Sequence, residues 1–185
     1  YGLGHVLTRL TNFLLLPLLT NSLTPQDYGI ISIIYVFIGF TMTFYRYGMD
    51  SALMKFYIEE NKPKTYFSSI LFLQIITSLI FSFILFLSRG YIEPLLVGNG
   101  EKIFITYIVI IIFCDIVWNL IILTLRASEK PLQFVAFNIF NVVMTLGFTI
   151  YLVNIKEMGA EGVLIGNLIA SMIMVFLSSL LLIKQ

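Results

Sequence analysis

Six long apolar runs follow one another along the chain, and they restrict its possible folds more than any other feature. A bilayer hydrocarbon core about 30 Å thick needs roughly 20 apolar residues per helix. Runs of this length occupy residues 4–23, 28–47, 66–87, 103–125, 132–153 and 163–183. They are much longer than the strands of about 10 alternating residues that build a membrane barrel. The pattern predicts an all-α membrane protein, with six transmembrane helices in a single unit over residues 1–185.

The composition agrees with a membrane protein and excludes several other classes. Only 11% of the residues are charged, against about 25% in soluble domains. The net charge is +1 and no dense basic run is present, so we expect no nucleic-acid partner. The single cysteine, Cys114, cannot support a disulfide framework.

Basic residues in the connections predict the orientation of the chain, because cytoplasmic loops are enriched in Lys and Arg. Seven lie in the second and fourth connections and after the last run, and three lie in the first, third and fifth connections. We therefore expect both ends on the cytoplasmic side. The chain begins at Tyr1 rather than Met, almost inside the first run, so we also expect further residues before it.

The first run carries a polar face that includes a permanent cation. His5, Thr8, Arg9 and Asn12 are spaced at i, i+3, i+4 and i+7, which places them on one side of a helix. An Arg in a membrane helix costs about 2.5–3.5 kcal/mol on insertion scales. Arg9 is therefore expected to face a partner, a cavity or a substrate.

The second run carries a polar and aromatic stripe whose members lie three or four residues apart. Its members are Tyr28, Ser32, Tyr35, Gly39, Met42, Arg46, Met49 and Asp50. One interpretation is the wall of a cavity that contacts a sugar or a headgroup. The other is ordinary helix packing with interfacial Tyr anchors at the two ends.

Asp115 lies near the middle of the fourth run, where a carboxylate must be paired, protonated or functional. Asn119 is one turn further along the same face. The functional interpretations are a proton or sodium coupling site, or a partner for Arg9. The structural interpretation is a hydrogen-bonded node with Asn119.

The remaining polar segments predict local structure rather than chemistry. Residues 51–65 are expected to form a charged cytoplasmic loop, in which 52–57 form either an interfacial helix or an extension of the second helix. Residues 89–100 predict an external turn. Gln74, Ser78 and Ser82 receive no chemical role. The small residues Gly162, Gly166 and Ala170 predict close packing of the last helix.

Catalytic and nucleotide-binding patterns are absent from the sequence. No loop groups His with Asp, Glu or Ser, and no Gly-rich nucleotide loop is present. We therefore expect no enzyme activity, no catalytic residues, no cofactor and no metal site.

Several stretches together resemble one known family. They are residues 14–20 (LLLPLLT) with 23–29 (LTPQDYG), 46–53 (RYGMDSAL) with 55–57 (KFY), 125–127 (LRA) and 159–166 (GAEGVLIG). Their order and spacing resemble the polysaccharide transporters, or O-antigen flippases, of the multidrug/oligosaccharidyl-lipid/polysaccharide (MOP) flippase superfamily. The family pattern often has Arg where this chain has Lys55.

The resemblance implies one lobe of a two-lobe transporter with a central cavity that opens alternately to each side. This chain would be the N-terminal six-helix lobe, in the cytoplasmic (inner) membrane of a prokaryote. The implied partners are a lipid-linked oligosaccharide, membrane lipid, a C-terminal lobe of the same protein and the polysaccharide polymerase machinery.

The implied function is the flipping of polyprenyl-pyrophosphate-linked oligosaccharide for surface polysaccharide biosynthesis. The residues expected to contact substrate are Arg9, Asn12, Tyr35, Arg46 and Asp50, and those expected to couple an ion are Asp115 and Asn119. The alternatives are an ion-coupled multidrug or metabolite exporter and a non-transporting membrane scaffold. The positive charge of Arg9 argues against an exporter of cationic substrates.

Overall fold

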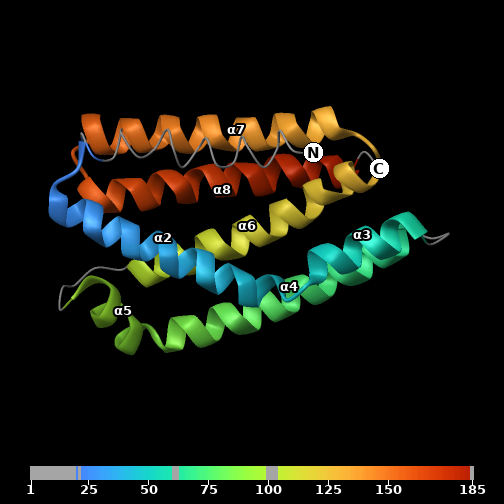
Figure 1. Cartoon of the computed structure of the whole chain (residues 1–185), viewed down its shortest axis with the longest axis horizontal. Helices are drawn as coiled ribbons and strands as arrows, with labels where there is room; N and C mark the ends of the chain where they lie inside the picture. The colour runs from blue at the N-terminus through green and yellow to red at the C-terminus, as the bar shows by residue number, and fades with distance from the viewer. Residues whose placement is uncertain (1–19, 21, 60–62, 99–103, 184–185) are drawn as a thin grey trace.

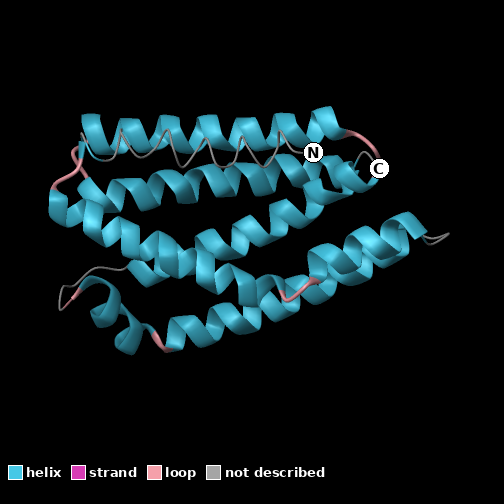
Figure 2. Cartoon of the chain, viewed as in Figure 1, coloured by secondary structure: helices cyan, strands magenta, loops and turns pink. Residues whose placement is uncertain are grey.

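The computed structural model of the chain describes residues 20, 22–59, 63–98 and 104–183. Every regular element within these ranges is helical (Figure 2). The elements are α2 (Pro25–Arg46), α3 (Met49–Glu59), α4 (Pro63–Leu87), α5 (Arg89–Val97), α6 (Phe104–Ala127), α7 (Pro131–Ile150), the π-helical turn η1 (Tyr151–Ile155) and α8 (Gly159–Ile183). Five helices are long and apolar enough to cross a membrane: α2, α4, α6, α7 with η1, and α8. The chain is therefore an all-helical, multi-pass membrane protein.

These five helices coincide with the last five predicted apolar runs, while the predicted helix at 4–23 lies, apart from residues 20, 22 and 23, outside the described residues. The largest shifts in their boundaries occur at helix starts. At the start of α2, the hydroxyl of Thr24 accepts a hydrogen bond from the backbone N–H of Asp27 at 3.1 Å. Pro25 takes the first helical position, where its missing N–H has no consequence. This cap starts α2 three residues earlier than its apolar pattern alone predicts.

Helix α6 is the centre of the described bundle, and α2, α4, α7 and α8 pack around it (Figure 1). Of its membrane-spanning window, 78% is buried, against 11–39% for the other four spanning helices. The core joins isoleucines of α6, including Ile108 and Ile112, to Ile34 of α2 and Leu164 of α8. Residues of α4 and α7 expose large apolar side chains outward, as lipid-facing helices do.

The small residues of α8 pack against α7 and η1, as predicted. A Cβ added to Gly166 would lie 2.9 Å from the backbone nitrogen of Thr149, and one added to Gly162 would lie 3.2 Å from the carbonyl carbon of Leu152. Ala170 is fully buried. The backbones of the two helices therefore approach too closely for larger side chains at these glycines.

Residues 89–97 correct one prediction, because the expected external turn contains the short helix α5. The carbonyl of Ser88 accepts the N–H groups of Tyr91 and Ile92, which closes the first turn of the helix. The carboxylate of Glu93 accepts the N–H of Phe104 at 2.8 Å and so caps the start of α6. Pro94 lies inside this helix.

Helix α3 occupies most of the stretch that was expected to be a charged loop. Residues 52–57 are therefore helical, as both alternatives expected, and they belong to a helix separate from α2 rather than to an extension of it. Leu53 of α3 is buried against Ile70 of α4 and Leu120 and Leu123 of α6. This apolar contact, rather than the charges, fixes the position of the segment.

Candidate functional site

Helix α2 stops at Arg46 because the next two residues leave the helical conformation. Tyr47 has a φ of 28° and Gly48 a φ of 87°, in the left-handed region. Glycine tolerates this conformation readily, since it has no Cβ. The chain then enters α3 at Met49, so the predicted end of the stripe falls on a break between two helices.

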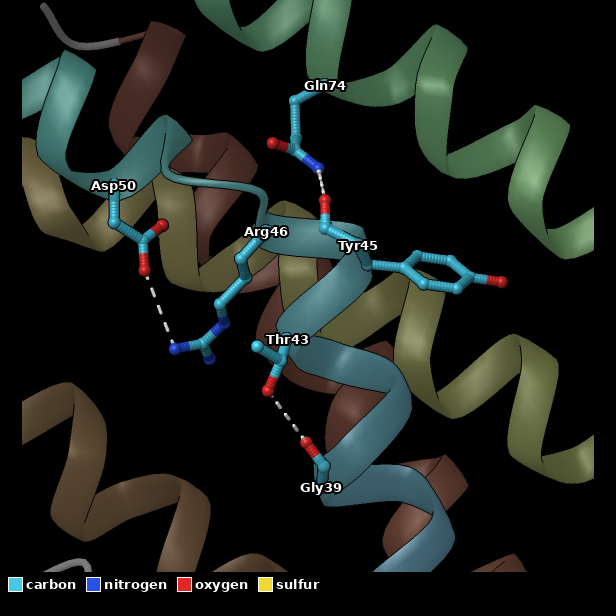
Figure 3. A network of polar contacts seen from close by, with 6 residues as sticks. All are labelled: Gly39, Thr43, Tyr45, Arg46, Asp50 and Gln74. Atoms are coloured by element: carbon cyan, nitrogen blue, oxygen red, sulfur yellow. Dashed lines mark hydrogen bonds and ion pairs between the residues drawn. The ribbon is translucent and has the colours of Figure 1, made fainter.

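Arg46 and Asp50 form an ion pair across this break (Figure 3). Nη1 of Arg46 lies 3.5 Å from Oδ2 of Asp50, and the two side chains are 38% and 41% exposed. A long, half-exposed pair of this kind contributes little to stability. Asp50 therefore holds the guanidinium of Arg46 only weakly, and the guanidinium can exchange this carboxylate for another anion.

The polar contact that ends α2 was not predicted. Nε2 of Gln74, on α4, donates to the backbone carbonyl of Tyr45 at 2.7 Å (Figure 3). The last carbonyls of a helix lack intrahelical partners and need another donor. Gln74, which received no role from the sequence, supplies that donor.

A second polar group lies between α6 and α8. Oδ1 of Asp115 accepts hydrogen bonds from Nε1 of Trp118 at 2.9 Å and from the hydroxyl of Ser171 at 2.6 Å. The charge of Arg46 also acts on this carboxylate. These two donors, rather than the expected Asn119, are the partners that the described residues give to Asp115.

Tyr35 connects the stripe of α2 to this group. Its hydroxyl lies near the side chain of Asn167 of α8, one turn before Ser171, and near the carboxylate of Asp115. Tyr35, Asp115, Asn167 and Ser171 thus form one cluster from three helices, which we call the central polar cluster. Asn119 is half-buried one turn further along α6.

The stripe of α2 lies between the packed and the outward faces of that helix. The packed face consists of Ile31, Ile34, Ile38, Thr41 and Tyr45. The outward face includes Ile33, Val36, Phe40 and Phe44, all of which are well exposed. The stripe residues between them are half-buried, apart from the exposed Gly39. This intermediate burial agrees with either interpretation of the stripe: a cavity wall or an edge of the helix packing.

Of the seven predicted site residues, five lie in the described part of the chain. The structure brings Arg46 to Asp50 and Tyr35 to the surroundings of Asp115, with Asn119 nearby. Arg9 and Asn12 lie outside the described residues. Sequence reasoning missed Asn167, Ser171 and Trp118. Asn167 and Ser171 are polar, lie four residues apart within the last apolar run, and could have been noticed for that reason.

One comparison with known proteins gives a match. A family model described as "Polysaccharide biosynthesis protein" matches residues 1–185. No curated protein and no solved structure matches the chain.

Proposed function

The chain belongs to the polysaccharide biosynthesis protein family, a family of MOP flippases, and on this premise we propose that it flips a lipid-linked oligosaccharide. The proposed substrate is an oligosaccharide on polyprenyl pyrophosphate, carried across the cytoplasmic membrane of a prokaryote for surface polysaccharide biosynthesis. Members of the family are transporters rather than enzymes. The proposed partners are a C-terminal lobe of the same protein, membrane lipid and the polysaccharide polymerase machinery.

The observation that carries the proposal is the weakly paired guanidinium of Arg46 at the end of the α2 stripe. A pyrophosphate that leaves water for the membrane needs a compensating cation. Arginine suits this role, because its planar fork binds phosphate oxygens through two parallel hydrogen bonds. Asp50 holds Arg46 when the headgroup is absent and yields it when the headgroup arrives.

The other proposed substrate contacts are Tyr35 on the α2 stripe and two residues of the first run. Tyr35 lies on the stripe about three turns before Arg46 and offers the hydroxyl that joins the stripe to the central polar cluster. Arg9 and Asn12, on the polar face predicted for the first run, would complete a cationic entrance from the cytoplasmic leaflet.

A second candidate function is an ion-coupled exporter of drugs or metabolites, for which the half-buried carboxylate of Asp115 offers a coupling site. In either function Asp115, with Asn119 beside it, is the proposed site for a coupling proton or sodium ion. The two candidates differ in the sign of the cargo, and the cation at Arg46 favours an anionic one.

The experiment compares Arg46→Ala and Arg46→Lys in cells that lack the native gene. We expect Arg46→Ala to lower surface polysaccharide at least about tenfold, since hydrogen bonds to charged groups contribute about 1.5–3 kcal/mol. Arg46→Lys keeps the charge but loses the fork, so its effect should be smaller. Arg89→Ala is the matched control, because Arg89 is exposed at the start of α5 and lies over the ring of Phe86.

The readout is the membrane face on which the polyprenyl-linked oligosaccharides accumulate, with their identity given by mass. Accumulation on the cytoplasmic face in the deletion strain and in Arg46→Ala supports flipping. Unchanged lipid-linked sugars together with greater sensitivity to cationic toxins would favour the exporter. Normal polysaccharide export by Arg46→Ala would remove Arg46 from the mechanism.

A further inference from the structure

The carbonyl of Tyr45 is a backbone acceptor that the break between α2 and α3 leaves without its usual donor. In a helix that continued through residues 47–50, this carbonyl would accept the N–H of Met49. The turn at Tyr47 and Gly48 prevents that bond. A carbonyl without a donor is costly within a membrane, because no water is present to replace the lost bond.

The side-chain amide of Gln74 is buried and supplies the missing donor to the Tyr45 carbonyl. Gln74 is 1% exposed, so water does not compete for its amide. Nε2 donates to the Tyr45 carbonyl at 2.7 Å and to the hydroxyl of Ser78 at 3.1 Å. Both protons of the amide nitrogen are thereby used, and only this end of the amide can donate to a carbonyl.

Two further contacts hold the same segment to α4 through side chains. The hydroxyl of Tyr45 lies 3.2 Å from that of Ser82, and the hydroxyl of Tyr47 lies 3.0 Å from that of Thr77. Both contacts join side chains, whereas Gln74 donates to the backbone carbonyl that the break leaves without its helical donor.

We propose that Gln74 is a positioning residue for Arg46, an inference that rests on the proposed function. By holding the Tyr45 carbonyl, Gln74 keeps Arg46 as the last residue of α2 and keeps Asp50 on the next helix. The exposed end of α2 then presents the guanidinium where the helix dipole favours a cation. Without the amide, α2 gains a bond by continuing into α3, and this changes the placement of Arg46 relative to Asp50.

The test measures binding of polyprenyl pyrophosphate to the full chain in nanodiscs, with the uncharged polyprenol as reference. Gln74→Met keeps the length of the side chain and removes the donor. We expect this variant to weaken pyrophosphate binding by about tenfold, the usual scale for a buried acceptor left without a donor. Ser82→Ala, which removes the contact to the hydroxyl of Tyr45, should change binding less than about twofold.

A second variant, Gly48→Ala, disfavours the same break and leaves Gln74 unchanged. A Cβ at Gly48 would meet no atom within 4 Å, so Gly48→Ala changes only the preference for a left-handed φ. It favours a continuous helix and should weaken binding as Gln74→Met does. It therefore tests the proposal even if Gln74→Met does not accumulate in the membrane.

A double-mutant cycle separates positioning from general loss of structure. In an Arg46→Ala background, Gln74→Met and Gly48→Ala should have no further effect on binding. An equal loss with and without Arg46 would overturn the proposal, as would normal binding by both variants. If Arg46→Ala itself binds pyrophosphate normally, the proposed function fails first.

Discussion

Two buried serines on α8 show how one residue type can have different roles in the same helix. Ser171 and Ser178 are 1% and 0% exposed. The hydroxyl of Ser171 donates to Asp115 across the interface with α6 at 2.6 Å. The hydroxyl of Ser178 donates to the carbonyl of Val175, on its own helix, at 3.1 Å. Only the first bond joins two helices and satisfies a carboxylate.

We therefore expect Ser171→Ala to destabilise the protein by about 1–3 kcal/mol, because it leaves the half-buried carboxylate of Asp115 with one donor fewer. Ser178→Ala should change the stability by less than about 0.5 kcal/mol, because the backbone carbonyl keeps its helical partner. Thermal unfolding in detergent, followed by near-UV circular dichroism, measures both. Equal melting temperatures for the two variants would show that the bond to Asp115 has no net effect on stability.

At the scale of elements, the close contact of α8 with α7 and η1 depends on the absence of side chains at two glycines. Gly166→Ala would bring a methyl group to 2.9 Å from the Thr149 nitrogen and 3.1 Å from the Phe148 carbonyl carbon. Backbone atoms cannot move aside as a flexible side chain can. The two helices would have to separate along this contact.

The expected cost of Gly166→Ala is about 1–3 kcal/mol, the usual range for overpacking. Gly147→Ala is the matched control, since Gly147 lies in α7 and a Cβ there meets nothing within 4 Å. That variant should be neutral or more stable by up to about 1 kcal/mol, from helix propensity. The melting temperatures of the two variants, measured side by side, separate the cost of overpacking at Gly166 from the gain in helix propensity at Gly147. A stable Gly166→Ala would show that α7 shifts more easily than its packing indicates.

The sequence predicted the spanning helices well, because a membrane helix is specified by the length of one apolar run. It left α3 open, because the apolar contact of Leu53 with α4 and α6 decides the position of that segment. It predicted α5 wrongly, because the backbone hydrogen bonds to the Ser88 carbonyl that close this short helix leave no apolar pattern in the sequence. The same limit applies to the site. Asp115 was identifiable as a lone carboxylate, but Ser171 is 56 positions further along the chain, and only the folded bundle brings the two together. Gln74 was missed because its partner is a backbone carbonyl, which no side-chain pattern reveals.

At the scale of the whole molecule, side-chain contacts show that the connections between helices lie in two groups, at opposite ends of the bundle. The hydroxyl of Ser128, in the α6–α7 turn, donates to that of Tyr57 on α3 at 3.3 Å. At the other end, the hydroxyl of Tyr107 donates to Glu161 at the start of α8 at 3.0 Å. The second and fourth connections, which hold most of the basic residues, therefore share one end.

This arrangement makes the predicted orientation testable with two cysteines. Cys114 is the single cysteine of this sequence, and Cys114→Ala removes its thiol. Lys130→Cys and Lys156→Cys then place one exposed thiol at each end of α7 with η1. Removing either lysine leaves the excess of basic residues on the same side, so neither substitution is expected to invert the chain.

If the basic end is cytoplasmic, a membrane-impermeant maleimide added to intact cells should label Lys156→Cys at once. Lys130→Cys should react only after the membrane is permeabilised. The reverse result would place the break between α2 and α3, and with it Arg46, on the outer side of the membrane. The pyrophosphate would then meet Arg46 on release rather than on entry, so this measurement also fixes the direction in which the proposed site works.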